Sequence, residues 1–363
     1  MPMIRNLEIS NFRAFKELKI SDLSNINIFV GSNNSGKTTI LEALFFIMGM
    51  SNPDIISKVS ASRDGQFFTN FEQIQYLFHK LDYKNIPFFS AEFDNEEKRE
   101  LKLIPIFKIL NSQSFSISNN MSSNIQTNID SAIQQLDFEF TLNEKGKIKK
   151  VFNNSIKTEN NNQFTIKTQN DYIEKYKTLL MKGAVNNDIL TTRRYSEILK
   201  RNKSEEKSKI LELIKTVEPD IINIQPLENS LYFEIKGIEP LLPINIMGDG
   251  IRYLLSIYTA VLENKNSFIL IDEIENGLHF SVYPTLWKGL FNFAKNNDVQ
   301  IFITTHSEEM LKSMQKISFD GYDKKENLKL FKVANTEKNG HKIYGYEYKD
   351  FEYAIENDIE LRK

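Results

Sequence analysis

Two patterns of apolar residues along this chain predict two kinds of β-strand. Three segments, 26–30, 268–272 and 299–305, are almost continuously apolar, which is typical of strands buried on both faces of a sheet. Each is followed by a segment with helical spacing of its apolar residues, at 39–47, 281–295 and 307–315. Buried strands that alternate with helices predict an α/β fold whose mostly parallel sheet has helices on both faces.

Segments that alternate between apolar and polar residues predict an antiparallel layer in the middle of the chain. Residues 136–142 alternate strictly, 143–146 supply a turn and 147–152 return, which predicts a β-hairpin. We expect the region 86–168 to form this layer, with a mobile Asn-, Ser- and Gln-rich insertion at 111–135. Further strands are predicted at 3–9, 16–20, 221–240, 328–334 and 342–348, and helices at 171–181, 194–217 and 351–357.

These patterns predict a chain in two parts. Residues 1–94 and 240–363 form a discontinuous head that contains the buried strands. Residues 95–239 form the antiparallel layer with its insertion and a short helical projection. No run of three or more heptads is visible, so this projection is not a long coiled coil.

The loop after the first buried strand predicts a phosphate-binding site. It has the G-x-x-x-x-G-K-T pattern of a P-loop, between a strand and a helix. Backbone N–H groups and the helix N-terminus can surround a phosphate there, while Lys37 reaches the β- and γ-phosphates and Thr38 ligates Mg²⁺. The alternative is a chance Gly- and Ser-rich loop. The predicted nucleotide-binding residues are Gly31, Ser32, Asn33, Asn34, Ser35, Gly36, Lys37, Thr38 and Thr39.

The ends of the next two buried strands carry groups suited to hydrolysis. The strand at 268–272 ends in Asp272, which fits a Walker B carboxylate that holds Mg²⁺ directly or through water. Glu273 is then placed to orient or deprotonate the attacking water. His306 ends the following strand and can hydrogen-bond the γ-phosphate or that water. The alternatives are a solvated strand end and a structural histidine. The predicted catalytic residues are thus Glu273, His306 and Lys37, and the predicted metal ligands are Thr38 and Asp272.

A second glycine pair predicts a second anion site. Gly248, Asp249 and Gly250 stand at the start of a predicted helix, where bare backbone N–H groups and the helix dipole attract an anion. The P-loop already serves the phosphates of its own subunit. These residues would therefore act on the γ-phosphate held by another subunit. The alternative is an ordinary turn before a helix.

Taken together, the motifs resemble those of the ABC-type ATPase heads of the SMC, RecF and OLD (overcoming-lysogenisation-defect) proteins. They also resemble bacterial AAA-type ATP-binding proteins from phage-defence and toxin–antitoxin-like loci. The resemblance covers both ends of the chain, and residues 95–235 carry none of it. The matching segments are 7–15 (LEISNFRAF), the P-loop with NSGK, 247–252 (MGDGIR), 272–279 (DEIENGLH), 304–307 (TTHS) and 354–362 (AIENDIELR).

The resemblance implies a homodimer of heads that sandwiches two ATP molecules. Gly248 to Gly250 would face the P-loop of the partner head, and residues 276–279 would stand at the position of the D-loop at the interface. The chain lacks the usual signature serine, so contacts to the γ-phosphate would come from the backbone. The Q-loop glutamine has three candidates, Gln66, Gln73 and Gln75.

Composition limits the remaining chemistry. The 363 residues include no cysteine, which excludes disulfides, thiolate metal sites and cysteine nucleophiles and favours a reducing compartment. The chain shows neither a signal-peptide pattern nor a membrane span, so we expect a cytoplasmic protein that does not bind membranes. The net charge of −2 argues against a basic coat for nucleic acid but leaves a local patch possible.

Two sets of basic residues each have two interpretations. Arg13 could contact phosphate or be an exposed arginine on a turn. The second set could contact nucleic acid phosphates, but interleaved glutamates favour a solvated helix face. This second set comprises Arg193, Arg194, Lys200, Arg201, Lys203, Lys207 and Lys209.

The sequence therefore predicts an ATPase of the ABC-head class that dimerises around ATP and Mg²⁺. We expect a nucleotide-driven switch for a separate effector protein, in bacterial phage defence. An alternative is a RecF- or SMC-like ATPase that acts directly on DNA. A nuclease like OLD is less favoured, because it needs a further acidic metal cluster after the ATPase.

Overall fold

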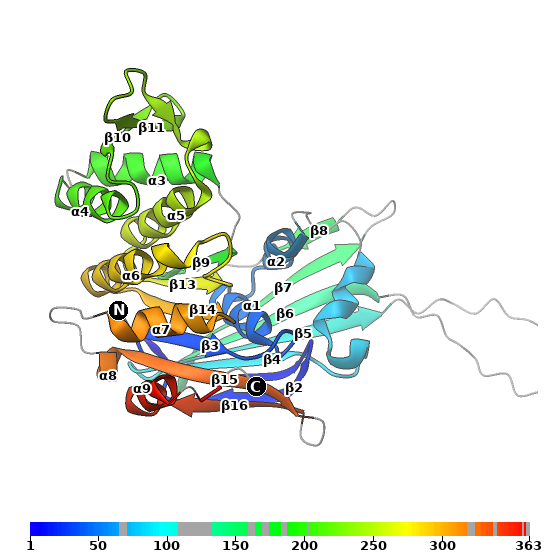
Figure 1. The fold of residues 1–363 in the computed structure, drawn as a ribbon. Coiled ribbons are helices and arrows are strands. Elements are labelled where there is room, and N and C mark those ends of the chain that lie inside the picture. Colours follow the sequence, from blue (N-terminus) through cyan, green and yellow to red (C-terminus); the bar gives the residue numbers. More distant parts are fainter. Residues whose placement is uncertain are drawn as a thin grey trace, which may run out of the picture.

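In the computed structural model, the described residues form two large β-sheets and one small sheet, with helices between and around them (Figure 1). The described residues are 1–64, 71–107, 133–158, 164–168, 174–182, 187–201, 204–317, 324–336, 340–357 and 359–360. The predicted insertion at 111–135 lies outside them except for its last three residues, which belong to a strand.

A six-stranded sheet carries the three buried strands as its centre. Its strand order is β16-β15-β3-β14-β13-β9, and every neighbouring pair except β15 and β16 is parallel. The predicted parallel sheet is thereby confirmed. The strands are β3 (Ile26–Val30), β9 (Lys177–Lys182), β13 (Ser267–Asp272), β14 (Gln300–Thr305), β15 (Leu328–Thr336) and β16 (Gly340–Tyr346).

Both faces of this sheet are buried, because alternate residues point to two separate cores. Ile269 and Ile271 of β13 pack in one core with residues of α5 (Asp249–Glu263), α6 (Tyr283–Asn297), α7 (Glu308–Lys316) and α9 (Tyr348–Glu356). Phe268 and Leu270 pack in the other core with α1 (Lys37–Met48). The continuous apolar runs in the sequence reflect this burial on two sides.

A seven-stranded antiparallel sheet lies across α1 from the first sheet, in the order β2-β1-β4-β5-β6-β7-β8. α1 contacts strands of both sheets, so it is buried between two layers (Figure 1). The predicted layer and its hairpin are confirmed. The strands are β1 (Ile4–Phe12), β2 (Phe15–Ile20), β4 (Phe88–Phe93), β5 (Glu97–Phe107), β6 (Ile133–Glu144), β7 (Lys147–Thr158) and β8 (Phe164–Lys167).

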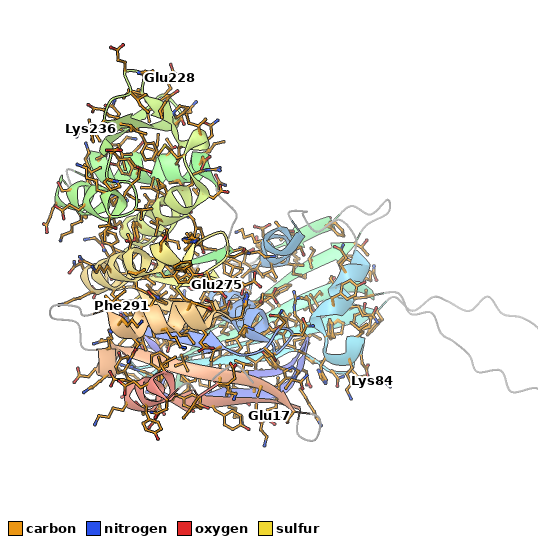
Figure 2. The ribbon with its side chains drawn as sticks, viewed as in Figure 1. Glu17, Lys84, Glu228, Lys236, Glu275 and Phe291 are labelled. Atoms are coloured by element: carbon orange, nitrogen blue, oxygen red, sulfur yellow. The ribbon has the colours of Figure 1, made fainter. Side chains whose placement is uncertain are left out.

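A projection of two helices and a small sheet stands on α5. Arg252 of α5 pairs with Asp188 at 2.8 Å, and the Tyr195 hydroxyl donates to the carbonyl of Ile224. Glu228 and Lys236 lie at its tip (Figure 2). Its elements are α3 (Asp188–Lys200), α4 (Ser204–Lys215), β10 (Ile221–Leu227), β11 (Ser230–Ile235) and β12 (Leu242–Pro243). The shorter elements elsewhere are α2 (Ile55–Asp64), α8 (Lys324–Asn327), η1 (Phe71–Leu77), η2 (His79–Leu81), η3 (Ile244–Ile246) and η4 (Phe280–Val282).

One predicted helix is wrong. The segment 171–181 was expected to be helical, but 177–182 is strand β9, which pairs with β13 in parallel. Its apolar residues pack at the edge of a sheet whose other strands lie far away in the sequence. The sheets also cross the predicted limits at 94 and 240, since β4 pairs with β5 and β11 with β12. The division into head and middle part stays a prediction.

The basic set on the projection is mostly paired with acids. Arg194 is buried, not solvated, and lies 3.3 Å from Glu263. Lys200 pairs with Glu197, and Lys209 with Glu205. Lys203 lies outside the described residues. The favoured interpretation was a solvated helix face, which fits the exposed Lys200 and is wrong for the buried Arg194.

Candidate nucleotide-binding site

The P-loop joins β3 to α1 in a conformation that requires two glycines. Gly31 has φ 153°, and a Cβ there would lie 2.3 Å from the carbonyl oxygen of Val333. Gly36 has φ 100°, and a Cβ there would lie 2.5 Å from the ring of Phe15. Neither position accepts a side chain without backbone movement. The loop is thus fixed against β15 on one side and β2 on the other.

Lys37, the first residue of α1, is held by the loop itself. Its ammonium donates to the carbonyls of Gly31 and Ser32, at 2.9 Å each. Burial lowers the pKa of Lys37 below its usual range, and the carboxylates of Asp272 and Glu275 oppose this effect. The carbonyls of Gly31 and Ser32 therefore bind the Lys37 ammonium, whereas residues 33–39 line a cleft.

Asp272 ends β13 directly opposite the start of α1. The Thr38 hydroxyl lies 3.0 Å from both carboxylate oxygens of Asp272. A hydroxyl and a carboxylate are the hard oxygen ligands that suit Mg²⁺, which keeps several waters and phosphate oxygens besides. The two predicted metal ligands are therefore brought together, and their donor set fits this ion.

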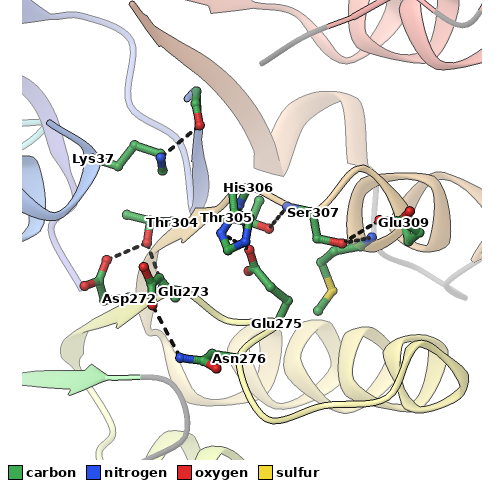
Figure 3. A network of polar contacts seen from close by, with 12 residues as sticks. Lys37, Asp272, Glu273, Glu275, Asn276, Thr304, Thr305, His306, Ser307 and Glu309 are labelled. Atoms are coloured by element: carbon green, nitrogen blue, oxygen red, sulfur yellow. Dashed lines mark hydrogen bonds and ion pairs between the residues drawn. The ribbon is translucent and has the colours of Figure 1, made fainter. Parts of the chain in front are cut away.

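Thr304 on β14 organises this edge of the sheet, and the sequence did not indicate it. Its buried hydroxyl donates to Asp272 at 2.6 Å and accepts from the Glu273 N–H at 2.8 Å (Figure 3). Glu273 has a left-handed φ of 50°, so its side chain leaves the strand direction and lines the cleft. Asn276 also donates to the Glu273 carboxylate, at 3.4 Å. The strand-end position of Thr304 was the only available sequence signal.

His306 lines the same cleft and is held by Glu275. The Glu275 carboxylate accepts from the backbone N–H of His306 at 2.7 Å, and it lies 2.8 Å from the ring Nδ1. Half of the His306 side chain is exposed, whereas Glu275 is buried. The predicted site histidine is thus at the site, but its carboxylate partner was missed.

The cleft has a volume of about 990 Å³, which is at the large end of ligand sites. The P-loop, Asp272, Glu273 and His306 line it together. The sequence did not indicate Lys182 of β9 or the aromatic and apolar side chains that also line the cleft. Arg13 also lines the cleft, pairs with Glu42 at 3.0 Å and is mostly buried, so it is not an exposed turn arginine. The remaining lining residues are Ala14, Tyr76, Phe78, Lys80 and Leu81.

The glycine pair at the start of α5 lies outside this cleft. Gly248, Asp249 and Gly250 are not among its lining residues. Asp249 pairs with Arg252 at 2.9 Å, and a Cβ at Gly250 would make only ordinary contacts with Leu278 and Val282. Their action on a partner's nucleotide stays a prediction.

Two of the Q-loop candidates can be placed, and neither lines the cleft. Gln75 donates to the carbonyl of Leu81, and Gln73 is exposed. Gln66 lies outside the described residues.

In the described part of the chain, no helix has the length and hydropathy needed to cross a bilayer.

Comparisons with known proteins agree with this geometry. The family described as "AAA ATPase domain" matches residues 3–311. The "ATP/GTP phosphatase" of Helicobacter pylori is 27% identical over 342 residues, which cover 87% of this chain and 88% of that protein. The RecF replication and repair protein of Lactobacillus johnsonii is 48% identical over 44 residues, only 12% of each chain. The solved SMC head bound to the C-winged helix domain of ScpA aligns with 96% of this chain and 99% of that one, at a TM-score of 0.51 and 13% identity.

Proposed function

The chain belongs to the AAA ATPase domain family and has the fold of an SMC head, and on this premise we propose an ATP-driven switch. Two copies bind ATP with Mg²⁺, close on the two nucleotides and reopen after hydrolysis. The closed and open forms then differ in what they bind.

One observation carries the proposal: phosphate-binding, metal-binding and water-activating groups meet at one edge of the six-stranded sheet (Figure 3). Lys37 binds the β- and γ-phosphates, and Thr38 and Asp272 hold Mg²⁺. Bound Mg²⁺ would neutralise charge on the phosphates. Glu273 orients or deprotonates the water, and the exposed ring of Tyr76, which also lines the cleft, packs against the base.

The second half of the switch comes from the partner head. Gly248 to Gly250 lie outside the cleft of their own chain and begin α5, a helix of 15 residues. Their exposed backbone N–H groups and the helix dipole favour the γ-phosphate of a partner's nucleotide. Asn276 contacts Glu273 and lies in the segment 276–279, which the resemblance to ABC-type heads implies is the D-loop at the dimer interface. Closure of the dimer would therefore change the surroundings of Glu273.

The experiment is light scattering on the variant Glu273→Gln, with and without Mg-ATP. This variant retains ATP, so closure should double the mass from the 42.3 kDa of one chain. Lys37→Ala is the control and should stay at its starting mass. A monomer that binds ATP without doubling would overturn the assignment of Gly248 to Gly250. An assembly that already exists without ATP would mean that the switch acts inside a standing complex.

The output is proposed to be a separate effector protein in phage defence, reached through the middle part 95–239. The projection stands directly on α5, since Arg252 and Asp188 join them at 2.8 Å, so closure at the start of α5 would move it. A pull-down with Glu273→Gln and Mg-ATP should retain an effector that Lys37→Ala does not. The same effector retained by both variants would contradict a nucleotide-driven output.

A second candidate function is direct action on DNA, as a RecF- or SMC-like ATPase. The local match to RecF favours it. A groove beside the cleft also carries several cations, including Lys16, Lys80 and Lys342, which could contact phosphates. DNA should then raise the turnover of ATP in a salt-dependent way. Unchanged turnover at low salt would count against this candidate.

A third alternative, a nuclease like OLD, needs a metal cluster beyond the ATPase site. The described residues contain no group of three or more His, Asp or Glu side chains arranged to hold a metal ion.

A further inference from the structure

Glu275 has no part in the chemistry assigned so far, yet it is built into the edge of the cleft. It lies in the turn after β13, two residues beyond Glu273, and its side chain is 7% exposed. Its Oε1 accepts from the backbone N–H of His306 at 2.7 Å and lies 2.8 Å from Nδ1 (Figure 3). One buried oxygen therefore fixes both the backbone and the ring of His306.

This contact determines which ring nitrogen carries the proton. An ionised carboxylate only accepts hydrogen bonds, so Nδ1 of His306 must be the N–H donor to Glu275. In the neutral ring, Nε2 on the opposite edge then has the lone pair and accepts. Because His306 lines the cleft and is half exposed, Nε2 is the nitrogen that can act there.

The other oxygen of Glu275 points to a connection with α5. Oε2 is buried and makes no hydrogen bond within the described part of the chain, and the same holds for the hydroxyl of Tyr253 on α5. Burial, and next the charge of Glu275, raises the pKa of the Tyr253 phenol, which stays a donor. The phenol thus lacks an acceptor and this carboxylate oxygen lacks a donor, and a movement of α5 or a bridging water that joined them would satisfy both. Figure 2 shows Glu275 at the level of β9 and β13, below the projection.

We propose that Glu275 is a positioning residue, which holds His306 in the Nδ1-protonated tautomer so that Nε2 accepts a hydrogen bond from the attacking water. Tyr253 ties this arrangement to the helix that begins with the glycine pair. The catalytic consequence rests on the proposed function, whereas the tautomer does not. Closure at the start of α5 would thereby reach His306 through a single carboxylate.

The tautomer is tested by NMR of protein with ¹⁵N-labelled histidine. The chain has four histidines, and His306→Ala identifies the signals of His306. The neutral wild-type ring should show a protonated Nδ1. Glu275→Ala removes the acceptor at Nδ1 and should shift the ring toward a protonated Nε2. Glu308→Ala, at a partly exposed neighbour that pairs with Lys312, is the matched control and should leave the spectrum unchanged. A protonated Nε2 in the wild type, or no change in Glu275→Ala, would overturn the inference.

The catalytic role is tested by a double-mutant cycle. Glu275→Ala removes the acceptor that holds His306 and should lower kcat at least about tenfold. KM for ATP should change less than about twofold, because the residue acts on the water and not on ATP binding. In a His306→Ala background the same substitution should change kcat less than about twofold. Equal losses in both backgrounds would show that Glu275 does not act through His306. Absence of ATP hydrolysis in the wild type would instead overturn the proposed function. The NMR experiment would then still test whether Glu275 sets the tautomer of His306.

The connection to α5 has a test of its own. Tyr253→Phe removes only a hydroxyl that has no hydrogen-bond partner among the described residues, so the thermal midpoint should not fall. Its kcat should nevertheless fall about threefold or more if the hydroxyl joins Glu275 during turnover. An unchanged kcat would remove Tyr253 from the arrangement.

Discussion

The two glycine-rich segments of this chain differ in how completely they are held. The P-loop is fixed on both sides, at Gly31 by β15 and at Gly36 by Phe15, and its lysine is bound by its own carbonyls. Gly248 and Gly250 meet only ordinary contacts or open space. The P-loop part of the proposed site is therefore complete within one chain, whereas the segment proposed to act on a partner's nucleotide has few contacts of its own. We therefore expect mutations to change ATP affinity and head closure separately.

Lys37→Ala should have the largest effect on ATP affinity, because it alters the P-loop, which is complete within one chain. Loss of its charge-assisted contacts to phosphate, worth about 3 kcal/mol, should weaken binding about 100-fold. Titration with a fluorescent ATP analogue measures this loss. The matched control is Lys58→Ala, an exposed lysine paired with Asp54, which should bind normally. Equal affinity in Lys37→Ala and wild type would remove Lys37 from the site.

Removal of Mg²⁺ should have the next largest effect. Chelation with EDTA should weaken binding of ATP by the wild type about tenfold, equivalent to about 1.4 kcal/mol. Asp272→Asn should shrink this difference between the two conditions, since the variant lacks the carboxylate proposed to hold the ion. Asp298→Asn, at the exposed end of α6, is the control and should keep the full difference. Calorimetry in both buffers provides the measurement.

Thr304→Val should change stability and turnover more than affinity. The substitution keeps the shape but leaves the buried N–H of Glu273 without its acceptor, which costs about 1–3 kcal/mol. We expect a lower midpoint in urea and slower hydrolysis, with ATP affinity within about threefold of wild type. Thr259→Val is a matched buried control on α5, where the hydroxyl only bonds to carbonyls of its own helix. Identical behaviour of the two variants would deny Thr304 its organising role.

Gly250→Asp should have the smallest effect on affinity and the clearest effect on closure. A side chain fits there in one chain, since its Cβ would lie 3.8 Å from Leu278 and Val282. Binding of ATP by the monomer should stay within about twofold, but the negative charge should prevent the ATP-dependent dimer. Gly250→Ala adds the Cβ without the charge and should still dimerise. Light scattering separates the two variants, and a dimer of Gly250→Asp would refute the action of this segment in trans.

The groups of the P-loop part of the site could be predicted because parallel strands end at a common edge. Asp272 and His306 each follow a continuous apolar run, and their convergence with the P-loop follows from the sheet alone. Thr304 and Glu275 could not be predicted, since their roles depend on side-chain contacts between the ends of the neighbouring strands β13 and β14 and the segments that follow them. Strand β9 was missed because its few apolar residues are half-buried at a sheet edge and lack a strand period.

The order of strands in the six-stranded sheet has a consequence for synthesis of the protein. β3, which leads into the P-loop, is made first but pairs only with β14 and β15. Its ladder therefore waits until more than 300 residues have left the ribosome. The nascent chain passes through a long period in which an almost continuously apolar strand has no neighbour. This places a demand on chaperones that contacts close in sequence would not create. Nucleotide binding is thus a late event in the life of each new chain, and it reports that both ends of the chain have met.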